Sequence, residues 1–90
     1  MALTLGAKVG DVFDVATRWI AVRSVASRSR AIVIRDDGQK FTVSSHHMTE
    51  IAPDVWIGLG PYSPRYKLRL VFDAPRHIPI LRRNKERVEL

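Results

Sequence analysis

The chain of 90 residues contains no cysteine, which excludes disulfide bridges and thiolate metal sites. This absence is compatible with a reducing compartment, and we expect a cytoplasmic protein. No apolar run approaches the ~18–20 residues that a membrane-spanning helix needs. The opening, MALTLGAKVGD, has neither the basic start nor the long apolar stretch of a secretory signal. The sequence therefore predicts neither membrane insertion nor secretion.

Acidic residues are in the minority. Fifteen Lys and Arg stand against nine Asp and Glu, giving a net charge of +6, and most of the basic residues are Arg. A small domain this basic typically binds a polyanion, most often a nucleic acid. Arginine suits bidentate contacts to phosphate and guanine. The alternative is a protein that its arginines only keep soluble. Both halves carry similar net charge, so there is no separate basic tail.

Short runs of alternating apolar and polar residues dominate the chain, and turn residues separate them. This pattern predicts an all-β fold, a small barrel or sandwich of antiparallel strands. The expected strands are 3–5, 12–16, 19–25, 31–35, 41–44, 55–60 and 66–72, followed by a short strand with Pro79 in its middle. Residues 48–51 are open to a helical turn. Good helix formers from Arg82 onward predict a short C-terminal helix.

We expect a single domain over residues 1–90, with an internal echo at a spacing of 37 residues. Residues 19–45 align without a gap on 56–82, and the only two tryptophans of the chain coincide. The order of long strand, basic loop, strand, acidic turn and strand also repeats.

Two interpretations of this echo stay open. The first is a duplication with pseudo-repeat units 9–46 and 47–90. The second is that two β-meanders resemble each other because all meanders alternate. The echo ends where Ser44-Ser45 stands opposite Leu81-Arg82, so only the second half carries the arginine.

Residues that could support catalysis or bind a metal are few. His46 and His47 with Glu50 form the one suggestive cluster, but two such side chains do not fill a zinc site, and a surface loop is the favoured interpretation. The sequence has no Gly-rich phosphate loop and no nucleophile elbow. We therefore expect no enzyme activity, no cofactor and no metal.

Aromatic residues make up only 8% of the chain. Trp19 and Trp56 stand at the heads of alternating strands, which favours core or half-core positions over base stacking. Other basic and aromatic residues in loops are interpreted either as auxiliary contacts to a nucleic acid or protein, or as a solvated surface. These candidates are Arg28, Arg30, Arg65, Tyr66 and Arg76.

Two segments carry a family resemblance. LRLVFDAPRHIPILRR, residues 68–83, matches the pattern V-R-(I/L)-G-(I/V)-x-A-P-(K/R)-x-(V/I)-x-(V/I)-x-R at Leu68, Arg69, Leu70, Ala74, Pro75, Arg76, Ile78, Ile80 and Arg82. LTLGAKVGD, residues 3–11, is in step with L-x-L-(T/S)-R-(R/K)-x-G-E at Leu3, Leu5, Lys8, Gly10 and Asp11. These patterns resemble those of the carbon storage regulator (Csr/Rsm) family, small bacterial RNA-binding translational regulators.

The resemblance implies a Csr-like fold and function. In that family two chains interlock their strands into a homodimer, and RNA binds where the first strand of one chain lies beside the fifth strand of the other. The RNA presents GGA in hairpin loops or single strands of messenger leaders, and binding represses translation or alters message stability. The implied RNA-binding residues are Leu5 and Lys8 on one wall, and Ile80, Leu81, Arg82 and Arg83 on the other.

The chain also departs from the family pattern. Residues 17–53 form an extra meander, and Gly6-Ala7 replaces a threonine–arginine pair of the first strand. Together with the echo, this leaves two arrangements open: an ordinary homodimer, or a fused single-chain pseudo-dimer whose second site is degenerate. Two other functions also stay open. One is a basic β-barrel that binds a protein partner, such as a phage or mobile-element factor, without RNA readout. The other is a nucleic-acid binder without sequence preference.

Overall fold

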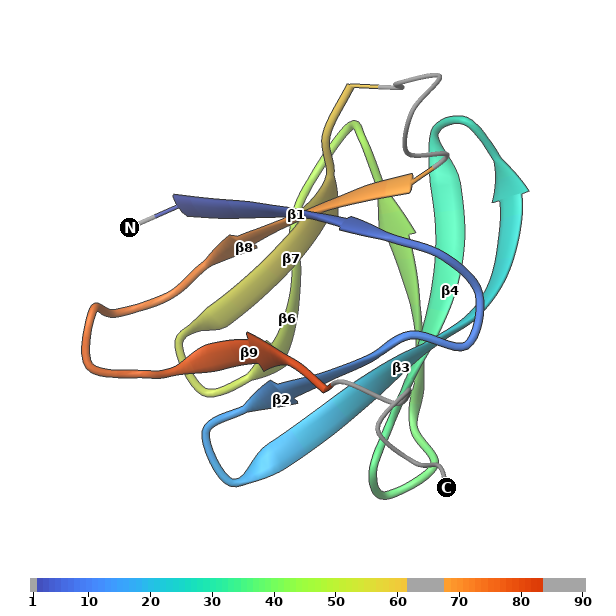
Figure 1. Cartoon of the computed structure of the whole chain (residues 1–90). Coiled ribbons are helices and arrows are strands. Elements are labelled where there is room, and N and C mark those ends of the chain that lie inside the picture. Colours follow the sequence, from blue (N-terminus) through green and yellow to red (C-terminus); the bar gives the residue numbers. More distant parts are fainter. Residues whose placement is uncertain (1, 62–67, 84–90) are drawn as a thin grey trace.

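Nine β-strands make up the regular secondary structure of the computed structural model, which describes residues 2–61 and 68–83 (Figure 1). The strands are β1 (Ala2–Ala7), β2 (Val12–Val15), β3 (Arg18–Ser27), β4 (Arg30–Arg35), β5 (Lys40–Ser44), β6 (Thr49–Ala52), β7 (Val55–Leu59), β8 (Leu68–Asp73) and β9 (Ile80–Arg82). All their pairings are antiparallel. Within these ranges there is no helix that is long and apolar enough to span a bilayer.

The predicted all-β class is confirmed, with differences at two segments. The helical turn that the sequence allowed at residues 48–51 does not form, because residues 49–52 form β6 and pair with β7. The last strand begins only after Pro79, whose carbonyl accepts a hydrogen bond from the Ala16 amide at 3.0 Å. Arg82 belongs to β9 rather than to a helix, and the rest of the predicted C-terminal helix lies outside the described residues.

The strands form two sheets whose orders are β1-β8-β7-β6 and β5-β4-β3-β2-β9. Apolar side chains at alternate positions of both sheets face one shared core, as expected for strands with one buried face. Phe13 and Phe72, both fully buried, meet across it with ring centroids 5.8 Å apart. The other large side chains buried to this degree are Ile20, Val22, Val33, Val43, Ile51, Val55, Ile57 and Leu70.

The internal echo reappears in the chain order of the strands. A first meander, β2 to β5, is followed by a second, β6 to β9, and both β2 and β3 begin 37 residues before their counterparts β6 and β7. The last strand of each meander departs from this correspondence. Whereas β5 stays beside β4, its counterpart β9 leaves the second meander and pairs with β2 of the first.

The opposite exchange occurs at the start of the chain. β1 pairs with β8 of the second meander along six residue pairs, from Ala2↔Asp73 to Ala7↔Leu68. Each end of the chain thus supplies an outer strand to a sheet otherwise built from the other part of the chain (Figure 1). The two halves are interlocked by this exchange and share one core.

The two tryptophans occupy equivalent positions on the outer faces of the sheets. Trp19 pairs with Asp14 and is half-buried, whereas Trp56 pairs with Glu50 and is 41% exposed. The expectation of a core position is therefore wrong for Trp56. The physical reason is the alternation of the strands, since Ile20 and Ile57, one residue further on, take the inward positions.

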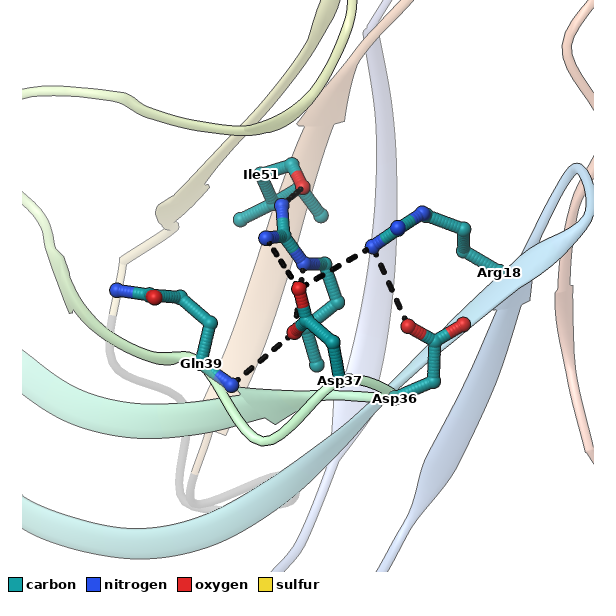
Figure 2. A network of polar contacts seen from close by, with 6 residues as sticks. Arg18, Asp36, Asp37, Gln39 and Ile51 are labelled. Carbon is teal, nitrogen blue, oxygen red and sulfur yellow. Dashed lines mark hydrogen bonds and ion pairs between the residues drawn. The ribbon is translucent and has the colours of Figure 1, made fainter.

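Arg35 connects the two sheets at the turn between β4 and β5. Its guanidinium group donates two hydrogen bonds to the Asp37 carboxylate, of 3.0 and 2.7 Å, and one of 2.7 Å to the Ile51 carbonyl of β6 (Figure 2). Asp37 also accepts from the Gln39 amide, and Arg18 pairs with Asp36 at 3.2 Å. The acidic turn predicted from the sequence thus neutralises the arginines at this end of β3 and β4.

This arrangement makes a part of the folding stability dependent on pH, so that acid weakens it. The hydrogen bond from Arg35 is the main cause that holds the pKa of Asp37 well below its usual range. A carboxyl group with a lowered folded-state pKa stabilises the fold fully above its unfolded pKa of ~3.9, and this contribution falls as the pH drops below that value. We expect Asp37→Asn to lower the unfolding temperature at pH 7. The difference between the unfolding temperatures at pH 7 and pH 2.5 should be smaller for this variant than for the wild type.

Thermal unfolding followed by circular dichroism at the two pH values measures this effect. Asp54→Asn is the matched control, because no described residue forms an ion pair with the Asp54 carboxylate. If the unfolding temperatures of the wild type and Asp37→Asn fell equally between pH 7 and pH 2.5, the stabilising role given to the Asp37 carboxylate would be wrong.

Candidate nucleic-acid interface

The first and last strands of the described chain meet at one side of the molecule. β1 is an edge strand of one sheet and β9 is an edge strand of the other. The Arg82 side chain bridges them by donating a hydrogen bond to the carbonyl oxygen of Gly6, 76 positions earlier in the sequence. The structure therefore brings together the two walls predicted from the sequence, the segment around Leu5 to Lys8 and the segment from Ile80 to Arg83.

The backbone of β9 has one paired side and one free side. The Arg83 amide donates to the Val12 carbonyl at 2.8 Å, and the Ala16 amide donates to the Pro79 carbonyl at 3.0 Å. Residues that exchange such bonds alternate with residues whose backbone groups face the opposite side. The amide and carbonyl groups of Ile80 and Arg82 therefore face away from β2, toward the free edge of the sheet. Such free donors and acceptors suit recognition of the edges of unstacked bases.

Arg82 is exposed and lies above the core at the mouth between the two sheets. Its guanidinium carbon is 5.6 Å from the ring centroid of Phe13, the residue directly across the β2–β9 ladder. No ion pair to Arg82 occurs among the residues that the structure describes. A positive charge held over an aromatic ring without an acidic partner is available to a ligand.

Arg83 lies next to Arg82 but in a different environment. Its guanidinium group is hydrogen-bonded to the Asp14 carboxylate and lies 5.9 Å from the ring centroid of Trp19. The hydrogen bond to Asp14 is the main cause that raises the pKa of Arg83. Because a carboxylate already occupies this fork, Arg83 has less charge to offer an anion than Arg82 has.

The other predicted residues on the two walls play unequal parts. Leu5 faces the core and is half-buried, so only its backbone and its neighbours can belong to the wall. Lys8 is exposed at the start of the β1–β2 loop, and Asp11 closes this turn with hydrogen bonds to and from its backbone. Ile80 packs against the core, whereas Leu81 is 64% exposed on the opposite face of β9 from Arg82, where its ladder partner is Asp14.

The auxiliary residues do not gather at this edge. Arg28 and Arg30 lie at the β3–β4 turn. Arg76 is exposed in the β8–β9 loop, which leads into β9 at Ile80, whereas Arg82 is at the other end of that strand. The predictions for Arg65 and Tyr66 lie outside the described residues.

Sequence reasoning missed Arg69 as a member of the interface. Arg69 of β8 is the direct ladder partner of Gly6, whose carbonyl accepts from Arg82. Because Gly6 has no side chain, it leaves the outer face of the sheet open beside Arg69. A cation on β8 thus lies beside the Gly6-Ala7 segment, where the family pattern has an arginine on the first strand. Nothing in the sequence signalled this, because the register of β1 on β8 is a long-range property.

β5, the equivalent of β9 in the first meander, ends in serines instead of an arginine. β5 continues into Ser44 and Ser45; the Ser44 hydroxyl accepts from the His46 amide at 2.9 Å, and the Ser45 amide donates to the Ser29 carbonyl. His46 and His47 are exposed in the loop that follows. Among the described residues, no three His, Cys, Asp or Glu side chains are grouped as metal ligands would be.

These features define the class as a small basic all-β protein, built from two interlocked meanders, with a cationic edge where β1 and β9 come together. Comparison of the chain with protein-family models, with curated proteins and with solved structures found no match. The function is therefore inferred from the interface itself together with the motifs of residues 3–11 and 68–83.

Proposed function

We propose that the chain is a non-enzymatic RNA-binding regulator of the carbon storage regulator type. It recognises GGA in the leader of a messenger RNA, in a hairpin loop or a single strand, and represses translation or alters message stability. The observation that supports this most directly is the hydrogen bond from Arg82 to Gly6, which joins the β1 and β9 edges. These are the strands whose motifs resemble the RNA-binding strands of that family.

The physics of this edge favours RNA over a double-stranded target. Sequence-specific recognition of RNA acts on splayed, unstacked bases, which hydrogen-bond to backbone groups and stack on planar or apolar side chains. The free backbone groups of Ile80 and Arg82 supply the hydrogen bonds, and the planar Arg82 guanidinium group, which has no acidic partner among the described residues, supplies a stacking and hydrogen-bonding surface. Arg69 and Lys8 add positive charge on the facing strand and its loop.

In our proposal one chain does the work that two chains do in the family. β9 pairs with the first meander and β1 pairs with the second, so the strands interlock within a single molecule. The second potential site is degenerate, because Ser44 and Ser45 carry no cation, and they are hydrogen-bonded to His46 and to Ser29 of the β3–β4 turn. We therefore propose a monomer that binds one RNA, in place of a homodimer.

The test is calorimetric titration with a short RNA hairpin that carries GGA in its loop, compared with the same hairpin carrying CCA. We expect the GGA hairpin to bind at least tenfold more tightly in moderate salt, with one RNA per 10.2-kDa chain. Light scattering of the complex should give one chain and one RNA.

Two other results would each replace the proposal by another function. Equal binding of both hairpins with a steep salt dependence would indicate a nucleic-acid binder without sequence preference. Absence of binding to either hairpin would leave a protein-interaction module as the function.

A further inference from the structure

The longest strand of the molecule extends past the core and forms an arm with β4. β3 has ten residues; Ile20 and Val22 are buried, whereas every residue from Arg23 to Ser27 is exposed. We call residues 23–30 the arm. Its tip is ordered by a hydrogen bond of 3.2 Å from the Ser29 amide to the Ser27 hydroxyl. In Figure 1 the arm lies at the right of the view beside β4, and the β1–β2 loop passes next to its base.

Two irregularities in the β3–β4 ladder shape the arm. The pair Val22↔Val33 is followed by Ser24↔Ile32, so Arg23 is an extra residue on β3 without a partner on β4. The same happens again between Val25 and Ser27. A β-bulge of this kind bends the strand, increases its twist and redirects a side chain, and bulges are frequent beside functional sites. Here the first bulge directs an arginine to the surface where the arm leaves the core.

The charge on the arm is of one sign. From residue 15 to residue 35 the sequence contains five arginines and no Asp or Glu. Arg18 and Arg35, at the end remote from the arm, are neutralised by Asp36 and Asp37. Among the described residues, neither Arg23 nor Arg30 forms an ion pair. Arg23 and Arg30 therefore present positive charge without an acidic partner among the described residues, which is the recognition pattern for a chain of phosphates.

The arm begins at one end of the candidate interface. The Gly10 amide donates to the Val22 carbonyl, and the Val22 amide donates to the Asp11 carbonyl, both at 2.9 Å. These bonds attach the β1–β2 loop, with Lys8 at its start, to the base of the arm. β9 reaches the same end of β2, where Arg83 bonds to Val12. Arg82, Lys8 and Arg23 therefore follow one another from the interface to the arm.

We infer that the arm binds the sugar-phosphate backbone of the RNA that flanks the recognised bases, on one side only. This inference rests on the proposed function, since it extends the same RNA along the protein. β3 advances ~3.3 Å per residue, so the four steps from Arg23 to Ser27 span roughly 13 Å of backbone path. The opposite end of the interface has no such extension, because the Asp36–Asp37 turn binds Arg18 there.

The experiment compares three RNAs: the minimal GGA hairpin, the same hairpin with a 5′ overhang of six uridines, and the same hairpin with a 3′ overhang of six uridines. The protein variants are Arg23→Gln with Arg30→Gln, and a control with equal loss of charge, Arg18→Gln with Lys40→Gln. All four positions are at the surface, and thermal unfolding verifies that both double variants fold.

We expect one of the two overhangs to raise the affinity of the wild type about tenfold, as two exposed charge contacts would do. The arm variant should lose this gain and keep its affinity for the minimal hairpin within about twofold. Its slope of log K against log salt on that overhang RNA should become shallower by about 1.4, or ~0.7 for each phosphate contact to a single strand. The control variant should retain the gain.

Retention of the full gain by the arm variant would overturn the inference, as would an equal gain from both overhangs. The preference of the wild type for GGA over CCA is measured on the minimal hairpin, which does not reach the arm. The experiment therefore distinguishes a chain that does not recognise GGA from one that recognises GGA but does not bind flanking RNA through the arm.

Discussion

Arg82→Ala is expected to lower the affinity for the GGA hairpin about thirtyfold. Loss of one good arginine contact to a base costs roughly 2 kcal/mol, which corresponds to this factor in Kd. Arg82 is the strongest candidate because its charge has no acidic partner among the described residues and its side chain lies between the β1 and β9 edges. The affinity for the CCA hairpin should change much less, so the preference for GGA should collapse.

Three further variants separate the role of the guanidinium fork from that of charge. Arg82→Lys keeps the charge but loses the planar pair of donors, so it should restore only a small part of the affinity. Arg83→Ala should cost less than Arg82→Ala, because Asp14 already binds the Arg83 fork. Lys40→Ala removes one charge from β5, at the opposite edge of the same sheet, and is the control. Unchanged GGA affinity in Arg82→Ala would show that β9 is not the RNA-binding edge.

The largest effect on stability is expected for Phe13→Ala. Phe13 and Phe72 are fully buried and join the two sheets, with ring centroids 5.8 Å apart and an interplanar angle of 52°. Truncation of a buried phenylalanine to alanine costs about 3–5 kcal/mol, because the lost transfer energy is added to that of the cavity left behind. A domain of this size has a total stability of ~5–15 kcal/mol, so the loss should remove between about a fifth of it and nearly all of it.

Chemical denaturation of Phe13→Ala, Phe72→Ala and the double variant measures this contribution. The two single effects should not add, and the coupling free energy should be about 0.5–1.5 kcal/mol, as for other aromatic pairs in contact. Val9→Ala is the control, since Val9 is 57% exposed and should change the stability by less than about 0.5 kcal/mol. A loss below about 1 kcal/mol for Phe13→Ala would mean that the two sheets do not pack through this pair.

Phe13 also connects stability to the interface. Its ring lies under the Arg82 guanidinium group at 5.6 Å, and both residues occupy the same pair of the β2–β9 ladder. The last strand thus anchors on the first meander through a residue of the central core. An edge held in this way is positioned before any ligand arrives, which lowers the ordering cost of binding.

Local patterns in the sequence were sufficient for the class of fold and for most strands. The runs around Ile20, Val33 and Leu70 alternate, and each places its apolar residues inside. β6 was missed because its four residues, Thr49–Ala52, are too few for a period to be seen, and Ala52 and Glu50 are good helix formers. Its strand conformation depends on pairing with β7 and on the burial of Ile51, which are both tertiary contacts.

The candidate site divides in the same way. The sequence motifs indicated the two segments that the structure brings together, and the basic residues Lys8 and Arg82 were recognisable within them. The difference between Arg82 and Arg83 was not, because it depends on Asp14, 69 positions away in the sequence. Arg69 was overlooked as a site residue for a similar reason, since only the register of β1 on β8 places it next to Gly6.

The sequence by itself determined the β-strand content, the excess of positive charge, the acidic turn at residues 36–38 and the absence of any cysteine-based site. These are local properties, because alternation, turn chemistry and charge are set by residues close together in the chain. The tertiary structure alone decided that β9 pairs with β2 and that β1 pairs with β8. Alternation defines which face of a strand is buried but leaves its neighbour open, so the meeting of Arg82 with Gly6 depends on packing of the whole core.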